Sequence, residues 1–211
     1  MRVHTRQRIR LKGILIAVLA ILLLAVVGIW SNDRHRQSCS TFESIEARAE
    51  EAYKFAKTKG LSLEKAFFVD YSIPSGTPRL FVWDFKEKRI VARTYVMHGS
   101  GGGSTAEKPC FSNEVGSGCS SLGRFKVTKS HVYHLKRSFL MVGYDKTNSN
   151  ALKRGIMIHR STWVDIKHRK KYIPLHSDSC RGCITVGTRG MKYLEKTIKA
   201  DPKPILLWSY E

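Results

Sequence analysis

The sequence predicts a mainly β domain of the α+β class, a β-sandwich or barrel with a few helices, behind one N-terminal transmembrane helix. Residues 66–210 contain many short runs rich in β-branched and aromatic residues, each bounded by turn residues. Helical periodicity is confined to one segment before these runs and to a late one at 191–200. Ile14–Trp30 is an unbroken apolar run. Many short strands with few helices indicate a sandwich or barrel.

The apolar run, taken as residues 13–30, has the length that a membrane-spanning helix requires, about 17–25 residues. Residues 1–12 are basic and carry no acidic residue, so we expect them to stay in the cytoplasm. A polar stalk at 31–41 and a domain at 42–211 would then lie on the periplasmic or extracytoplasmic side of the cytoplasmic membrane. A cleaved signal peptide is the alternative, although its hydrophobic region usually has only about 7–15 residues.

The size of the chain indicates how many domains it can form, but its charge is compatible with several classes of partner. The chain has 211 residues, of which 42% are hydrophobic, and this gives room for one ordinary domain plus an anchor. Its formal net charge of +20 attracts polyanions such as nucleic acid, anionic wall polymer or an acidic membrane surface. The predicted export argues against nucleic acid as a partner.

The first predicted element of the domain is a docking helix. Ser40 and Glu43 form a capping box that would start it, and Gly60 is a natural stop. Apolar residues between them recur at helical spacing. Strands are then expected at 67–72, 79–85, 89–98, 123–128, 139–144, 155–159, 183–186 and 205–210. Residues 86–88 would form a hairpin turn, and 191–200 a late helix.

The segment 99–121 is rich in glycine and serine and is expected to be a loop. No Gly-Lys-Ser/Thr follows its glycines, which excludes a phosphate-binding loop. Cys110 and Cys119 lie in this segment, and we predict a disulfide between them that closes the loop. The chain has five cysteines, so at least one thiol stays unpaired even in an oxidising compartment.

Two segments carry the residue types of nucleophilic catalysis. Cys183 begins one β-like run and His159 ends another, so adjacent strands would bring them together. A thiol attacks a carbonyl only as a thiolate, and a histidine within hydrogen-bond reach can take its proton. Gly182 allows a tight turn before the cysteine, where backbone N–H groups could hold an oxyanion. We therefore predict Cys183, His159 and Gly182 as catalytic residues.

The pattern His … Ser-x-Gly-Cys resembles the L,D-transpeptidase catalytic domain, a β-rich fold that cross-links peptidoglycan. The resemblance is closer to the branch of murein L,D-transpeptidase catalytic domain proteins and covers residues 42–211. It rests on the order of several blocks, which are FFVDYSIPS (67–75), RLFVWD (79–84), VMHGSG (96–101), SSLG (120–123) and IMIH (156–159).

The resemblance implies a role for each site residue. Cys183 would take the acyl group of a peptidoglycan stem peptide, and His159 would accept the thiol proton and later activate the acceptor amine. The carbonyl that orients the imidazole would come from Arg160 or Ser161. No cofactor or metal is implied, and the partners are stem peptides and, through the N-terminal helix, the membrane. Substrate contacts are expected from four side chains, Arg181, His98, Ser179 and Arg160.

Three departures from the family pattern keep alternatives open. Arg160 stands where the family has Gly or Ser, Arg181 where it often has His, and Cys180 where it has Ser. A hydrolase of the L,D-carboxypeptidase type would use the same residues, and a degenerate domain would bind peptidoglycan without reacting. Cys180-x-x-Cys183 also fits a redox motif, and a zinc site could use Cys180, Cys183, His159 and His176.

Overall fold

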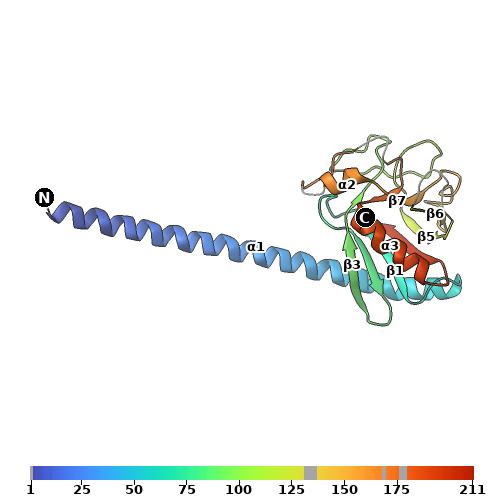
Figure 1. Cartoon of the computed structure of the whole chain (residues 1–211), viewed down its shortest axis with the longest axis horizontal. Helices are drawn as coiled ribbons and strands as arrows, with labels where there is room; N and C mark the ends of the chain where they lie inside the picture. The colour runs from blue at the N-terminus through green and yellow to red at the C-terminus, as the bar shows by residue number, and fades with distance from the viewer. Residues whose placement is uncertain (1, 131–136, 168–169, 176–179) are drawn as a thin grey trace. The chain divides into compact units, whose positions relative to one another are not determined.

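A computed structural model describes residues 2–130, 137–167, 170–175 and 180–211 of the chain (Figure 1). The chain forms two units, Met1–Ile45 and Glu46–Glu211. One helix, α1 (Arg2–Thr58), begins in the first unit and ends in the second.

Helix α1 is longer than predicted, because residues 31–41, expected to be a stalk, are helical as well. The expectation that a capping box at Ser40 starts a new helix was wrong. The sequence from 29 to 59 contains no glycine or proline that would interrupt a helix already formed. The predicted stop is confirmed, since the helix ends at Thr58 and Gly60 has a left-handed φ of 66°.

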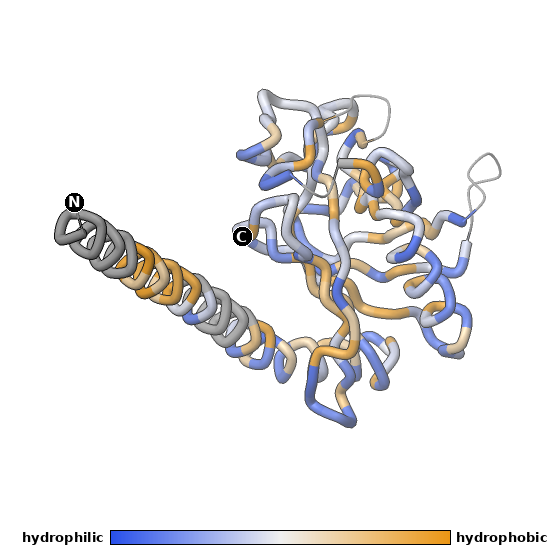
Figure 2. The backbone as a smooth tube through the Cα atoms, turned by 60° about the vertical axis from the view of Figure 1, so that its left-hand side comes forward, coloured by the Kyte–Doolittle hydropathy of each residue, from blue (hydrophilic) through white to orange (hydrophobic). Residues whose placement is uncertain are grey.

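The predicted membrane anchor finds no support in the structure. Over the described part of the chain, no helix combines the length and the hydropathy that crossing a bilayer demands. The large apolar side chains between Ile16 and Ile29 are exposed, and Figure 2 shows this stretch of α1 in orange. The extracytoplasmic location of the domain therefore stays a prediction.

The described strands form one nine-stranded sheet in the order β3-β2-β1-β9-β5-β6-β7-β8-β4. Neighbours pair antiparallel except β1 with β9 and β7 with β8, which are parallel. The strands are β1 (Lys65–Asp70), β2 (Leu80–Asp84), β3 (Arg89–Thr94), β4 (Val96–Met97), β5 (Gly123–Val127), β6 (Ser138–Gly143), β7 (Met157–Arg160), β8 (Ile184–Val186) and β9 (Ile205–Tyr210). The mainly β class is thus confirmed, and the strand predicted at 89–98 is divided into β3 and β4.

Two short helices accompany the sheet. The late helix, α3 (Thr188–Ala200), buries Met191, Leu194 and Ile198 in the main core, as its periodicity predicts. It begins before the predicted start because the Asp165 carboxylate accepts hydrogen bonds from the Thr188 N–H (2.8 Å) and hydroxyl (2.5 Å). Asp165 belongs to α2 (Thr162–Lys167), a helix that the sequence analysis missed.

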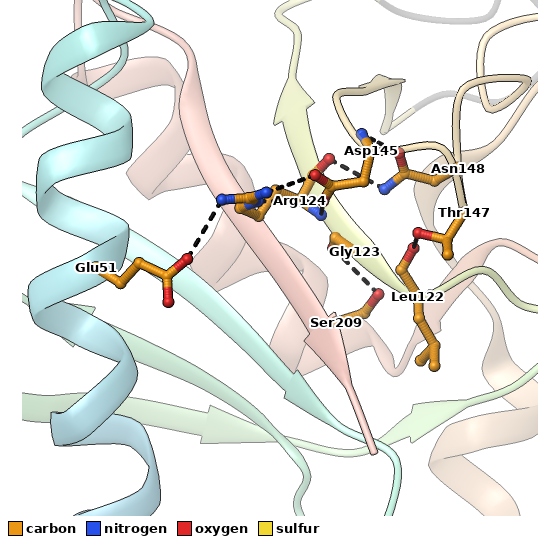
Figure 3. Close-up of polar contacts among 8 residues, drawn as sticks. All are labelled: Glu51, Leu122, Gly123, Arg124, Asp145, Thr147, Asn148 and Ser209. Carbon is orange, nitrogen blue, oxygen red and sulfur yellow. Dashed lines mark hydrogen bonds and ion pairs between the residues drawn. The ribbon is translucent and has the colours of Figure 1, made fainter.

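The part of α1 within the second unit docks on the sheet, as predicted, through buried alanines at 49, 52 and 56. Figure 3 shows the polar contacts beside it. Arg124 of β5 forms an ion pair with Asp145 (2.6 Å) and a longer one with Glu51 of the helix (3.4 Å). The Arg124 guanidinium also lies over the ring of Phe55, 4.4 Å from its centroid. Because Glu51 is largely exposed, we attribute the docking mainly to the buried alanines and the stacked ring.

Candidate active site

The candidate site lies where β7 and β8 pair in parallel. In their register His159 is opposite Thr185 and Ile158 is opposite Ile184. Cys183 immediately precedes β8, so the predicted pairing of the strand that holds His159 with the strand that follows the cysteine is confirmed. Thr185 and His159 share one face of the sheet, since the Thr185 hydroxyl is 3.1 Å from Nε2 of His159.

The hydrogen bonds of His159 fix its tautomer. Its Nδ1 is 3.2 Å from the carbonyl oxygen of Arg160, which can only accept, so Nδ1 carries the proton and donates. Nε2 is then an acceptor, and it receives the hydroxyl of Thr185 at 3.1 Å. Burial lowers the pKa of His159, which favours the neutral imidazole that a general base must be. The carbonyl expected to orient the imidazole is therefore that of Arg160.

Cys183 is a half-buried thiol in this resting state. Burial raises its pKa, while the backbone N–H of Met157 and the charge of Arg154 act in the opposite direction. Its Sγ is 3.9 Å from the carbonyl oxygen of Gly155. Across the described residues, no hydrogen bond joins this sulfur to His159. Catalytic contacts of this kind are often long without substrate and shorten when it binds.

Gly182 shapes the turn before Cys183. Its φ is 99°, a left-handed value that favours glycine. A Cβ at this position would lie 2.3 Å from the carbonyl oxygen of Cys119, so a side chain cannot be accommodated without moving the loop 99–121. The predicted tight turn at Gly182 is therefore present, and both the backbone conformation and the available space favour glycine there.

The predicted substrate contacts fall into three groups. Arg181 and Arg160 are exposed beside the site and remain candidates. Ser179 lies outside the described residues. His98 is fully buried, with Nδ1 2.9 Å from Arg79 Nη2 and Nε2 2.8 Å from the carbonyl oxygen of Thr105. Both ring nitrogens are thus occupied by the protein, and we replace its predicted role in substrate binding with one in anchoring the loop 99–121.

The predicted disulfide between Cys110 and Cys119 is absent, because both thiols are free. The structure does bring them together: a Cβ at Gly102 would lie 2.9 Å from the Cys110 sulfur and 2.3 Å from the Cys119 sulfur. A backbone bridge between Phe111 and Ser120 already closes the loop, which explains how it keeps its shape without a covalent link.

The geometry of the site also bears on the redox and zinc hypotheses for Cys180 and Cys183. Cys180 and Cys183 are both free, and the Cys180 thiol is buried and lies 3.1 Å from the carbonyl oxygen of Cys183. Burial raises the pKa of Cys180 to about 12, which is unfavourable for a redox-active thiol. Within the described ranges, no three side chains of the metal-ligating types cluster as a metal site would. His176, the fourth ligand of the zinc hypothesis, lies outside these ranges.

Two residues of the candidate site, Thr185 and Arg154, were not predicted from the sequence. Thr185 could have been found, since side chains two positions apart in the strand predicted at 183–186 would share a face. Arg154 gave no such signal, because its partners at Ser112, Ser117 and Cys119 are remote in sequence.

Comparison with known proteins points to one family. A family model described as "L,D-transpeptidase catalytic domain" matches residues 37–207. Among solved structures, the chain resembles the L,D-transpeptidase (residues 123–326) of Xylanimonas cellulosilytica at 15% identity and a TM-score of 0.38, over 69% of this chain and 60% of that one. It also resembles the helical cell shape determining protein Pgp2 of Campylobacter jejuni at 12% identity and a TM-score of 0.45, over 70% of this chain and 47% of that one. No curated protein matches the sequence.

Proposed function

Because the chain belongs to the L,D-transpeptidase catalytic domain family, we propose that it is a peptidoglycan L,D-transpeptidase working through an acyl-enzyme on Cys183. The observation that carries the proposal is the register of β7 and β8, which sets His159 with an acceptor nitrogen beside the strand that begins after Cys183. The substrate lies outside the cytoplasm, so the proposal includes an extracytoplasmic location for the domain.

In the first half-reaction, the Cys183 thiol gives its proton to Nε2 of His159, and the sulfur attacks a carbonyl carbon of the donor stem peptide. The tetrahedral oxyanion would be held by backbone N–H groups at the Gly182–Cys183 turn. The C–N bond then breaks, the leaving amine takes the proton from His159, and a thioester remains on Cys183.

In the second half-reaction, the amine of an acceptor stem peptide attacks the thioester and loses a proton to the same imidazole. The C–S bond breaks, the new amide forms, and Cys183 recovers its proton from His159. The Nδ1 bond to the Arg160 carbonyl keeps the imidazole oriented through both steps and stabilises the cation while it exists. Water in place of the amine would give the L,D-carboxypeptidase reaction.

The proposal is tested by the intact mass of the reduced protein after incubation with a carbapenem. A thiolate that opens the β-lactam ring adds the whole mass of the drug. We expect the adduct in the wild type and in Cys180→Ala but not in Cys183→Ala. An adduct that persists in Cys183→Ala would contradict the assignment of the nucleophile. Product analysis with and without an amine acceptor then separates transfer from hydrolysis.

A second candidate is a domain that binds peptidoglycan without reacting. It is favoured by the resting geometry, in which the acceptor nitrogen of His159 is engaged by Thr185 and not by the thiol. Folded wild-type protein that sediments with peptidoglycan yet never forms the carbapenem adduct would support this candidate over the transpeptidase.

A further inference from the structure

The guanidinium of Arg154 lies directly against the turn that carries the nucleophile. Arg154 precedes β7, and its Nη2 would be 2.9 Å from a Cβ placed on Gly182. The next residue, Gly155, has its carbonyl oxygen 3.9 Å from Cys183 Sγ. The Arg154–Gly155 segment therefore touches the catalytic turn at two points, one before the nucleophile and one at its sulfur.

The same guanidinium holds the loop that covers this turn. Nη1 donates to the carbonyl oxygen of Ser112 (2.6 Å) and to the hydroxyl of Ser121 (2.5 Å). Nη2 donates to the carbonyl oxygen of Cys119 (2.5 Å) and to the hydroxyl of Ser117 (3.3 Å). The Cys119 oxygen is also the atom nearest to a Cβ placed on Gly182, so the side chain that holds this oxygen lies beside the same glycine.

These contacts leave the charge of Arg154 without a counterion. Its partners are carbonyl and hydroxyl oxygens, and no carboxylate pairs with it anywhere in the described portion of the chain. Burial lowers its pKa, yet an arginine remains a cation at any physiological pH. A half-buried cation without a counterion stabilises any anion that forms nearby, and the anion required by a cysteine nucleophile is the thiolate.

We propose that Arg154 is a positioning residue of the active site, whose fork fixes the Cys119 carbonyl against Gly182 and whose charge stabilises the thiolate of Cys183. The inference rests on the proposed role of Cys183 as nucleophile. A lysine could supply the charge but not the planar fork, which bonds four oxygens at once.

Other charged or titratable groups among the described residues lie near Cys183. Arg160 and Arg181 are cations beside the site, but both are exposed, so solvent screens their charge. Burial lowers the pKa of His159 and so keeps it neutral at rest. Burial raises the pKa of both Tyr71 and Cys180 to about 12, so they too are uncharged. The buried cation Arg79 acts on Cys180 and Tyr71. Arg154, by contrast, acts on Cys183 itself.

The test is the rate at which iodoacetamide alkylates Cys183 as a function of pH, followed by mass mapping in the full chain. In Arg154→Gln we expect the apparent pKa of Cys183 to rise by about one unit, which is roughly a tenfold smaller thiolate fraction at neutral pH. Arg154→Lys should stay near the wild type. The matched control is Lys153→Gln, which removes an exposed charge from the adjacent position and should leave the profile unchanged.

Two results would overturn the electrostatic role. One is a profile of folded Arg154→Gln that superimposes on the wild type, and the other is a rise in Arg154→Lys as large as in Arg154→Gln. If Arg154→Gln does not fold, Arg154→Lys tests the positioning role of the guanidinium fork. We expect carbapenem acylation of this variant to slow about tenfold. An unchanged acylation rate would contradict the positioning role. Alkylation needs no peptide substrate, so these profiles can fail or succeed independently of the transpeptidase assignment.

Discussion

The hydroxyl of Thr185 lies 3.1 Å from Nε2 of His159, which is the nitrogen that accepts the thiol proton in the proposed mechanism. Thr185 is itself fully buried, and its hydroxyl is also within hydrogen-bond reach of the Cys180 thiol. The imidazole is thus held at both nitrogens, by a carbonyl on one side and by a hydroxyl on the other. The proposed mechanism therefore requires substrate binding to bring Nε2 and Cys183 together without losing this orientation.

Replacing Thr185 with valine should therefore slow acylation while leaving the fold intact. Valine has nearly the same shape but leaves Nε2 without its donor, so the imidazole loses one of its two fixed contacts. We expect the rate of carbapenem acylation to fall about tenfold, a part of the roughly 10²–10⁴-fold contribution of a general base. Thr185→Ser keeps the hydroxyl and serves as the control. A wild-type rate in Thr185→Val would show that the contact has no part in catalysis.

Replacing Gly182 with alanine should abolish acylation and destabilise the domain. The added Cβ would clash with the Cys119 oxygen. The alanine would also have to adopt a left-handed φ, which costs about 1–3 kcal/mol of backbone strain. Gly103→Ala is a matched control, because Gly103 also has a left-handed φ (79°) but nothing within 4 Å of its Cβ position. Urea denaturation and acylation rates check both variants. Equal losses in the two would show that backbone strain alone, and not the contact with Cys119, explains the effect.

The buried His98 should make the domain less stable at acidic pH. Burial and the charge of Arg79 lower the pKa of His98 to about 4, from 6.5 in the unfolded chain. Between these values only the unfolded chain takes up the proton. The stabilisation is therefore complete above pH 6.5, and it should fall by about 3 kcal/mol as the pH drops to 4.

His98→Gln isolates this contribution. Glutamine can still accept from Arg79 and donate to Thr105, but it does not titrate. Urea denaturation at several pH values should give a shallower slope for this variant than for the wild type. His159 affects both proteins in the same direction and so cancels in the comparison. Parallel slopes would contradict the assigned pKa of His98.

Alkylation of the native protein should distinguish the two neighbouring cysteines. Cys180 is 1% exposed and its pKa is raised to about 12, so iodoacetamide at pH 8 should leave it unmodified while labelling the half-buried Cys183. In urea both should react. Peptide mass mapping measures each site, and native labelling of Cys180 at a rate similar to Cys183 would contradict the burial seen here.

The strands could be predicted from the sequence because their signal is local, as the agreement at β5 and β9 shows. The candidate site was proposed from Cys183, His159 and Gly182 because their residue types suit cysteine catalysis, and their catalytic roles stay predictions. His98 was misassigned because its burial depends on Arg79, which belongs to a different part of the chain. The start of α1 was misplaced because a capping box indicates where a helix can begin, not whether an earlier helix already continues through it.

The position of β9 between β1 and β5 has a consequence for how the protein folds. Among the described strands, β1 to β3 pair with the rest of the sheet through β9 alone, so the two groups of strands cannot join until residues 205–210 are present. Contacts so distant in sequence slow folding, and they leave the open edges of β1 and β5 exposed in the meantime. Nascent chains stalled before residue 205 are therefore the species for which a chaperone would have most use.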